Sequence, residues 1–338
     1  MKYNDFNFNK KNILITGGAG FIGSNLAFYF QKHYPDARVC VFDKFRNQEK
    51  FSNGNLKSFG HYKNLIGFNG KVIAGDINAK DDLSRLESMD WDFIFHNAAI
   101  SDTRVYNQNI IMRTNVNAFT DLLELAVSKN AAMVYASSAA TYGDSPSPQK
   151  VGNSENPGNP YGYSKFAMDN ISRDFMKRYP GMTIVGLRYF NVYGPGEFYK
   201  DKTASTIVQF GHQILNGKAP KLFEHSDKIM RDFIFIEDVV QANILSAVTE
   251  QSGVYNVGTG ISRSFQEIAD LLQQNLKTTL GTKYIPNPYS SGYQDDTRAD
   301  IKESMAMLGY KPNYSLEDGI AAYADEIKRL YKEEVEHV

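Results

Sequence analysis

The 338-residue chain is predicted to be an α/β protein in which a doubly wound parallel sheet is followed by a smaller C-terminal α/β unit. Short apolar runs alternate with helical stretches through the first half. A glycine-rich segment follows the first run, and the segments become shorter and more mixed after about Arg188. Continuous apolar strands separated by helices are typical of a parallel sheet that is covered on both faces.

The first half supplies the predicted strands of this sheet and the helices between them. The strands are short runs of apolar and β-branched residues, and the helices carry apolar residues at intervals of three and four. We expect strands at 12–16, 38–43, 71–74, 93–96, 133–136 and 183–188, and helices at 21–34, 117–129 and 161–179.

The second half is predicted to be less regular. Residues 189–202 are rich in Tyr, Gly, Asn and Pro and should form a loop, and Ser264 is placed to cap the helix that follows it. We expect helices at 203–216, 237–249, 264–277 and 315–331, and strands at 233–236 and 253–257. We therefore expect two domains, 1–188 and 189–338, with elements of the second returning to the first.

The composition excludes several classes of protein. With 37 basic against 38 acidic residues, the net charge of −1 provides no field that would recruit nucleic acid or anionic lipid. The single cysteine, Cys40, rules out an internal disulfide and a multi-cysteine metal site, and its apolar surroundings predict burial. No stretch approaches the roughly 18 apolar residues of a membrane helix, and residues 1–12 lack the apolar segment of a secretory signal. We expect a cytoplasmic protein with no metal, no nucleic-acid partner and no membrane partner.

The segment from Thr16 to Gly23, which reads TGGAGFIG, predicts a dinucleotide site between the first strand and the first helix. Its glycines allow a tight turn and a close approach of the backbone to a pyrophosphate, which the N-terminus of the helix then binds. Asp43 ends the second strand, where its carboxylate can accept from the adenosine ribose hydroxyls. The residues expected to contact the dinucleotide are Gly17, Gly20, Phe21, Ile22, Gly23, Asp43, Lys44, Lys50, Asp76, Ile77, Asn97, Ala98, Ala99 and Asn115.

The residues alone leave the choice of dinucleotide open. Asp43 favours NAD because its charge would repel a 2′-phosphate. Lys44, Arg46 and Lys50 follow closely and could neutralise such a phosphate, which would favour NADP.

Tyr161 and Lys165 form a Tyr-x-x-x-Lys motif at the start of a predicted helix. Positions i and i+4 share one helix face, and an ammonium one turn away should lower the pKa of the phenol from its usual value of about 10. The phenolate could then take a proton from an alcohol while a nicotinamide takes the hydride. Ser138 ends the fifth strand and should face the same space. The set predicts redox chemistry on a carbinol.

The sequence resembles the extended short-chain dehydrogenases/reductases over nearly all residues after about Asn12. The motifs TGGAGFIG, FHNAA, YASSAATYG, YGYSK and RYFNVYGPGE are similar to those of the nucleotide-sugar epimerases in that family. Lys200, the TAS segment at 203–205, and PKLFE at 220–224 followed by RDF at 231–233 are most similar to its ADP-heptose 6-epimerases. The resemblance implies a Rossmann fold and an assembly into homo-oligomers.

The resemblance also implies a reaction and the residues that carry it. Tightly held NADP, with NAD as the alternative, would oxidise the heptose C6 carbinol to a 6-ketone and then return the hydride to the other face of C6. The epimerised sugar would supply heptose for the lipopolysaccharide core. Tyr161 and Lys200 would be the two proton-transfer groups, one for each face. Lys165 would hold the nicotinamide ribose, Ser138 would orient the substrate oxygen, and Val192 would touch the nicotinamide.

The substrate contacts implied by the resemblance lie mostly in the second half. Phe223–Ser226 would contact the ADP portion, and Arg231 would bind the diphosphate through its guanidinium fork. Lys202 and Gln209 stand where relatives often have other residues. The full set is Ser138, Asn191, Lys202, Gln209, Phe223, Glu224, His225, Ser226, Arg231 and Tyr293.

Two alternatives stay open at this point. A UDP-hexose 4-epimerase would use Tyr161, Lys165 and Ser138 equally well. A non-catalytic dinucleotide sensor belongs to another class, although such sensors typically lose the Tyr or the Lys of the pair. A 4,6-dehydratase is disfavoured because Ala139 and Ala140 stand where its chemistry needs an acidic pair.

Overall fold

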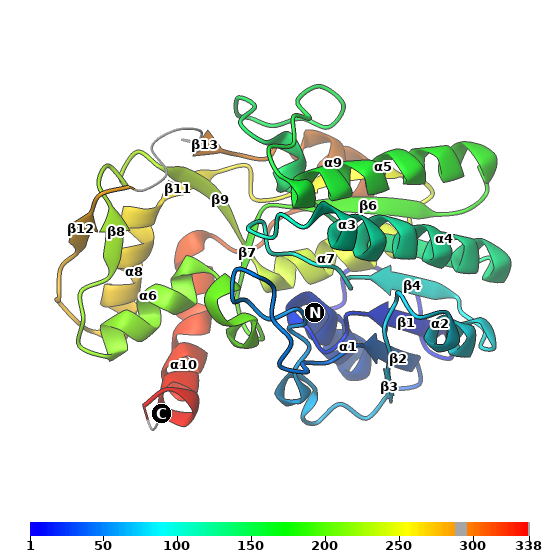
Figure 1. Cartoon of the computed structure of the whole chain (residues 1–338), viewed down its shortest axis with the longest axis horizontal. Helices are drawn as coiled ribbons and strands as arrows, with labels where there is room; N and C mark the ends of the chain where they lie inside the picture. Colours follow the sequence, from blue (N-terminus) through cyan, green and yellow to red (C-terminus); the bar gives the residue numbers. More distant parts are fainter. Residues whose placement is uncertain (288–295, 337–338) are drawn as a thin grey trace.

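The computed structural model describes residues 1–287 and 296–336, which form a large parallel sheet with helices on both faces and a smaller unit beside it (Figure 1). The sheet has seven strands in the order β10-β6-β5-β4-β1-β2-β3, and every neighbouring pair is parallel. This order is that of the dinucleotide-binding Rossmann fold, with one further strand, β10, beside β6. The strands are β1 (Asn12–Thr16), β2 (Arg38–Asp43), β3 (Lys71–Ala74), β4 (Phe93–His96), β5 (Ala132–Ser138), β6 (Ile184–Tyr189) and β10 (Gly253–Val257).

Alternate residues of the central strands supply two hydrophobic cores, one on each face of the sheet. Ile13 and Ile15 of β1 pack with the face that α1 (Phe21–His33) and α7 (Ile236–Ala247) cover. Leu14, between them, packs toward the opposite face. That face is covered by α2 (Lys80–Glu87), α4 (Ala118–Lys129) and α5 (Pro160–Arg178), and α3 (Gln108–Ile111) leads into α4 through a short π-helical turn.

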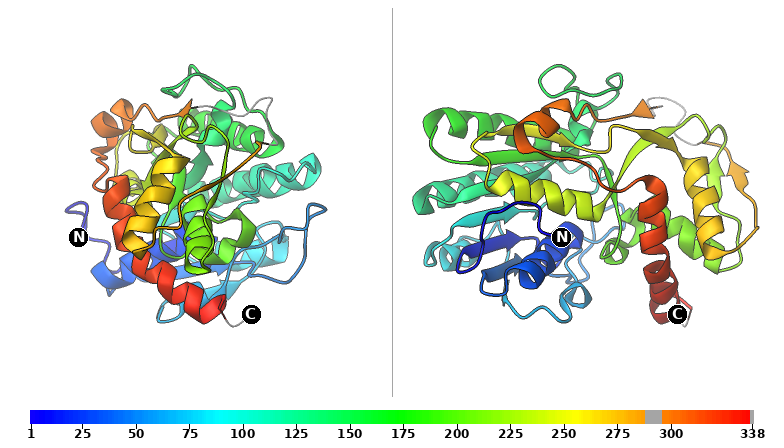
Figure 2. Two further views of the ribbon diagram at one scale, coloured as in Figure 1. Left: turned by 90° about the vertical axis from the view of Figure 1, so that its left-hand side faces the viewer. Right: turned by 180° about the vertical axis from the view of Figure 1, so that it is seen from behind.

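The smaller unit is built on β9, which contacts strands from distant parts of the chain. It pairs with β7 and β13 in parallel and with β11 in antiparallel orientation, and β8 pairs separately with β12. In Figure 2 the N-terminal segment lies beside α7, whereas α10 lies in the smaller unit. The elements are β7 (Asn191–Tyr193), α6 (Thr206–Leu215), β8 (Lys221–Phe223), β9 (Met230–Phe235), β11 (Ser262–Ser264), α8 (Phe265–Leu276), β12 (Lys283–Ile285), β13 (Asp296–Thr297), α9 (Lys302–Leu308) and α10 (Leu316–Glu334).

Most predicted elements are confirmed with shifts of a few residues at their ends. Ser264 caps α8 as expected: its Oγ accepts from Glu267 N at 3.1 Å, while the Glu267 carboxylate accepts from Ser264 N at 2.7 Å. Cys40 is buried, with 2 % of its surface exposed. Strand β10 and helix α7 do return to the large sheet, whereas a domain boundary at residue 188 stays a prediction.

The expectation of a plain loop at 189–202 is wrong. Residues Asn191–Tyr193 form β7, which pairs with β9, and Phe198–Thr203 form a 3₁₀ helix. Tyr193 is almost fully buried, so its packing offsets the turn-forming composition of the segment. No helix within residues 1–287 or 296–336 has both the length and the apolarity needed to cross a membrane.

Candidate active site

The glycine turn joins β1 to α1, and two of its glycines have no room for a side chain. Gly17 has a φ of +68°, and a Cβ on it would lie 2.7 Å from Ala98 N. A Cβ on Gly23 would lie 2.4 Å from Gly17 O. Gly20 begins α1 without a side-chain cap, so the first N–H groups of the helix are left for an anionic group.

A cavity of about 630 Å³ opens at the carboxyl ends of the central strands, where parallel sheets of this type bind ligands. It extends from the glycine turn to the smaller unit. Its lining includes most of the residues predicted for the dinucleotide: Gly17, Gly20, Phe21, Ile22, Gly23, Asp43, Lys44, Asp76, Ile77, Asn97, Ala98, Ala99, Lys165 and Val192.

Asp43 lies at the end of β2 with only 5 % of its surface exposed. Its carboxylate accepts from Ala19 N at 2.9 Å and from Phe45 N at 2.8 Å. Burial raises the pKa of this carboxyl, and the two backbone donors oppose the shift. Lys44 points toward the next strand, where its Nζ lies 2.8 Å from the Asp76 carboxylate.

Two polar side chains of the cavity wall indicate that a polar ligand belongs there. The amide N and O of Asn97 and the hydroxyl of Ser137 are buried and have no hydrogen-bond partner among residues 1–287 and 296–336. Buried polar groups are normally paired, so these atoms favour a bound group with donors and acceptors of its own. Together with the glycine turn, these unpaired polar atoms fit a cavity that binds a nicotinamide dinucleotide.

Two residues predicted for the dinucleotide do not line this cavity. Lys50 is exposed and bridges to Leu56 in a hairpin, and Lys57 on the returning side reaches the cavity instead. Asn115 is fully buried, and its amide bonds to the backbone of Ile100 and to Ser164 Oγ. Its side chain therefore holds the loop after β4 against α5.

Tyr161, Lys165 and Ser138 converge on the cavity, as predicted. Asn159 caps α5 and Pro160 opens it, which places Tyr161 in the first turn and Lys165 one turn later. Ser138 ends β5, and its Oγ accepts from Ala140 N at 3.1 Å. Lys165 Nζ donates to Ala136 O at 2.6 Å and lies 6.0 Å from the centroid of the Tyr161 ring.

The predicted direction of the Tyr161 pKa shift is wrong for the structure as it stands. Burial raises the pKa of this phenol, and only a hydrogen bond with Ser138 acts to lower it. Lys165 is itself 2 % exposed, and burial lowers the pKa of its ammonium to about 8 while Asp169 opposes that shift. The spacing of the motif predicts that the phenol and the ammonium lie close together. It does not predict how much burial shifts the pKa of each group.

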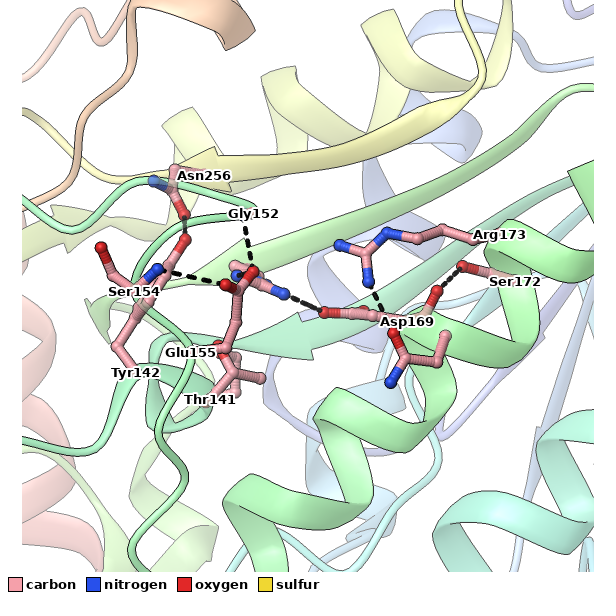
Figure 3. A network of polar contacts seen from close by, with 12 residues as sticks. Thr141, Tyr142, Gly152, Ser154, Glu155, Asp169, Ser172, Arg173 and Asn256 are labelled. Atoms are coloured by element: carbon pink, nitrogen blue, oxygen red, sulfur yellow. Dashed lines mark hydrogen bonds and ion pairs between the residues drawn. The ribbon is translucent and has the colours of Figure 1, made fainter. Parts of the chain in front are cut away.

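A buried network lies behind Lys165 and joins β5, α5, β6 and the loop before α5 (Figure 3). Asp169, one turn after Lys165, accepts from Tyr135 Oη at 2.9 Å and from Arg188 Nε at 2.9 Å. Arg188 is fully buried and also reaches Glu155, with 2.8 Å between Nη1 and Oε1. The network therefore fixes the helix face that carries Lys165.

Lys200 lies in the 3₁₀ helix after β7 and lines the same cavity. Its Nζ lies 5.8 Å from the centroid of the Phe21 ring, which belongs to the first turn of α1. Burial lowers the pKa of the Lys200 ammonium, and the charge of Glu197 opposes the shift. Glu197 is fully buried and accepts from Ser205 N and Ser205 Oγ at 2.6 and 2.8 Å. Its place in the cavity and the buried Glu197 nearby distinguish Lys200 from an exposed lysine in a loop.

The predicted substrate residues divide into two groups. Asn191 and Arg231 line the cavity together with Ser138. Lys202 and Gln209 are exposed and do not line it, and Gln209 Nε2 donates to Ala204 O at 2.6 Å. Phe223 ends β8, and Glu224, His225 and Ser226 follow it. These four residues also lie outside the lining, and Tyr293 lies outside the described residues.

Several residues of the wall were not predicted. Lys57, Ser137, Ser205, Thr206 and Phe265 line the cavity from four separate segments. Ser137 directly precedes Ser138 on β5, so the Ser-Ser pair at a strand end was an available signal. Ser205 ends the TAS segment that the sequence analysis singled out, but no contact was predicted for it. Lys57, Thr206 and Phe265 carry no motif, because their place depends on how the smaller unit and residues 44–60 fold over the sheet.

Comparison with known proteins identifies the family. The model of the NAD-dependent epimerase/dehydratase family matches residues 13–258. An ADP-L-glycero-D-manno-heptose-6-epimerase of Brachyspira hyodysenteriae is 34 % identical over 322 residues, which cover 94 % of this chain and 98 % of that protein.

Solved structures give the same result. The crystal structure of the Helicobacter pylori ADP-L-glycero-D-manno-heptose-6-epimerase is 47 % identical, with a TM-score of 0.87, and the match covers 97 % of this chain and 99 % of that one. A UDP-N-acetylglucosamine 4-epimerase from Methanobrevibacter ruminantium is 28 % identical, with a TM-score of 0.83, and 95 % and 99 % of the two chains are covered. The glycine turn, the Tyr161–Lys165 pair and these matches together place the chain in the NAD-dependent epimerase/dehydratase family of nucleotide-sugar enzymes.

Proposed function

We propose that this protein is an ADP-glycero-D-manno-heptose 6-epimerase that supplies heptose for the lipopolysaccharide core. It interconverts the D-glycero and L-glycero forms through a transient 6-ketone. The two relatives named for this activity are 34 % and 47 % identical to the chain, whereas the UDP-N-acetylglucosamine 4-epimerase is 28 % identical. The order of these identities favours the heptose substrate over a UDP-hexose.

One observation carries the proposal: Tyr161 and Lys200, from two distant elements, line one cavity together with the glycine turn. Inversion of a carbinol by oxidation and reduction needs a proton-transfer group for each face of the carbon. A dehydrogenase that acts on one face needs only one such group. Lys200 is therefore the candidate for the second proton-transfer group that the epimerase chemistry requires.

When bound, NADP or NAD supplies one hydride acceptor that later returns the same hydride. Tyr161 takes the hydroxyl proton of one epimer as the C6–H bond breaks, so that the C6–O single bond becomes a carbonyl. Lys200 gives a proton to the carbonyl oxygen when the hydride adds to the opposite face of C6. For the reverse reaction the two residues exchange roles. The oxidation state of the sugar is unchanged after a full cycle.

The remaining polar residues of the cavity orient the reactants. Ser138 hydrogen-bonds to Tyr161 and is placed to share the reacting oxygen with it. Lys165 holds the nicotinamide ribose. Arg231, 8 % exposed at the far end of the cavity, binds the diphosphate of the substrate, and Asn191 contacts the sugar.

We further propose NADP as the resident dinucleotide, with NAD as the alternative, and a homo-oligomeric assembly. Lys44 and Lys57 both line the cavity with Asp43. Lys44 is paired with Asp76 and Lys57 with Glu49, and both ammonium groups would have to turn to a 2′-phosphate to accommodate it. Native mass spectrometry of the purified protein measures the mass of the retained dinucleotide and the number of subunits in one experiment.

The substrate is tested by following the C6 proton of ADP-D-glycero-D-manno-heptose by NMR. The wild-type protein should convert it to an equilibrium mixture of the two epimers and leave UDP-glucose unchanged. Tyr161→Phe should retain the dinucleotide and lose about 10²–10⁴-fold in turnover, the usual contribution of a general acid or base. Inversion of UDP-glucose at C4 with no change in ADP-heptose would favour the 4-epimerase, and full turnover by Tyr161→Phe would contradict the mechanism.

A further inference from the structure

We propose that His61 is a positioning residue for Lys200 and couples it to the glycine turn through a ring stack on Tyr199. The inference rests on the proposed role of Lys200 and extends it to residues that do not line the cavity. Neither His61 nor Tyr199 belongs to the described lining, whereas Lys200 and Thr203 of the same short helix do. The effect of the stack must therefore pass through the Lys200 segment.

The contact between the two rings is a parallel stack. The His61 and Tyr199 ring centroids lie 4.0 Å apart, and the ring planes differ by 3°. His61 Nδ1 accepts from Lys63 N at 3.2 Å, so this nitrogen carries no proton. Burial lowers the pKa of His61, as do the charges of Arg46 and Lys63, and the charge of Glu334 opposes the shift. Arg46 reinforces the contact by donating from Nη2 to Tyr199 O.

The stack is connected to the glycine turn through Ala19. Ala19 O accepts from His61 N at 3.0 Å and from Asn64 Nδ2 at 3.1 Å. Asn64 Nδ2 also lies 3.2 Å from Gly196 O, which precedes the Lys200 helix. On its other side, Ala19 N donates to Asp43. The turn expected to hold the dinucleotide and the segment that carries Lys200 thus share one set of hydrogen bonds.

The C-terminal helix holds the same segment from the other side. Tyr199 Oη donates to Glu334 at 3.1 Å, and Lys63 Nζ lies 2.5 Å from that carboxylate. Glu326, also on α10, accepts from Gly196 N at 3.3 Å. Tyr199 is therefore held between the 44–64 segment and α10.

Lys200 needs such support even though Glu197 anchors the segment to Ser205, because its ammonium lies at the end of a flexible side chain. The 3₁₀ helix is interrupted at Asp201, which has a φ of +53°, and the lysine side chain has four rotatable bonds. A reacting group must be held near its productive geometry, and a displacement of about 1 Å can cost about 10²-fold in rate. The ring stack fixes the residue directly before Lys200.

Two substitutions at His61 separate positioning from a simple helix-capping role. His61→Phe keeps a ring for the stack and loses the Nδ1 acceptor that caps Lys63 N. His61→Asn keeps an acceptor for the cap and loses the ring. We expect His61→Phe to retain turnover, and His61→Asn to lose about 10²-fold in kcat with little change in KM, in retained dinucleotide or in Tm.

The reverse order of activities, with His61→Asn active and His61→Phe inactive, would show a capping role and overturn the inference. Equal activity of both variants and wild type would also overturn it. Lys200→Met distinguishes this failure from that of the proposed function. If Lys200→Met is inactive and both His61 variants are fully active, only the inference fails. If Lys200→Met has full turnover, the proposed role of Lys200 fails and the inference fails with it.

Discussion

Replacing Arg188 with methionine should reveal how strongly the buried network behind Lys165 stabilises the protein. The guanidinium and the Asp169 side chain are both 0 % exposed, and Glu155 is the second carboxylate paired with the arginine. Arg188→Met leaves both acids without their cation, while the methionine fills much of the same volume. The charge left in the core, rather than a cavity, then dominates the change in stability.

Removing one partner of a buried ion pair typically costs about 3–5 kcal/mol. With an unfolding entropy of roughly 2 cal/mol/K per residue, the 338-residue chain should lose about 4–7 °C in Tm. Without its cation, Asp169 is an unpaired acid in the core, where its side chain is 0 % exposed.

Urea titration measures the loss in the free energy of unfolding, and calorimetry measures the loss in Tm. Arg329→Met is the matched control, because the Arg329–Glu333 pair is about half exposed on both sides and should contribute at most about 1 kcal/mol. Adding Asp169→Leu to Arg188→Met should restore much of the lost stability, since it removes the unpaired acid. A loss from Arg188→Met no larger than that of the control would refute the reasoning.

Three further predictions concern other parts of the molecule. Gly23→Ala should abolish retention of the dinucleotide while far-UV circular dichroism stays unchanged, because its Cβ would lie 2.4 Å from Gly17 O; native mass spectrometry checks this. Ser264→Ala should cost about 1 kcal/mol by removing the α8 cap, and Ser264→Thr should cost less; urea titration gives both values. Burial lowers the pKa of His96 from 6.5 to about 3, so below pH 6.5 the unfolded chain binds a proton that the folded chain does not. Stability should therefore fall with pH between 6.5 and 3, by up to about 1.4 kcal/mol per pH unit from this group, and an unchanged slope in His96→Gln would contradict the assignment.

The sheet could be predicted from the sequence because its strands are buried on both faces and appear as continuous apolar runs. The strand at 12–16 and its partner at 38–43 match the structure residue for residue. Strand β7 was missed because its Asn, Val and Tyr lie among turn-forming residues, and only pairing with β9 makes them a strand. Short strands that depend on distant partners have no periodicity of their own.

The candidate site was predictable where residues lie at strand ends and helix starts. Asp43 lies at the end of a strand, and Tyr161 and Lys165 lie at the start of a helix, so the order of the strands in the sheet is enough to place all three at the cavity. Lys50 was predicted because it closely follows Asp43, but it lies in a hairpin whose fold brings Lys57, and not Lys50, to the cavity. The contact of His61 with Tyr199 joins residues far apart in sequence, and no local pattern encodes it.

Strand β10 completes the large sheet, although its residues are synthesised much later than those of its neighbour, β6. It pairs with β6 along Gly253–Val257, although β6 ends at Tyr189. During translation β6 must therefore remain an open edge, with unpaired backbone groups, until more than sixty further residues have left the ribosome. A fragment that stops near residue 190 would keep this edge permanently. Such a nascent or truncated chain should be prone to strand-mediated association, which ends once β10 is in place.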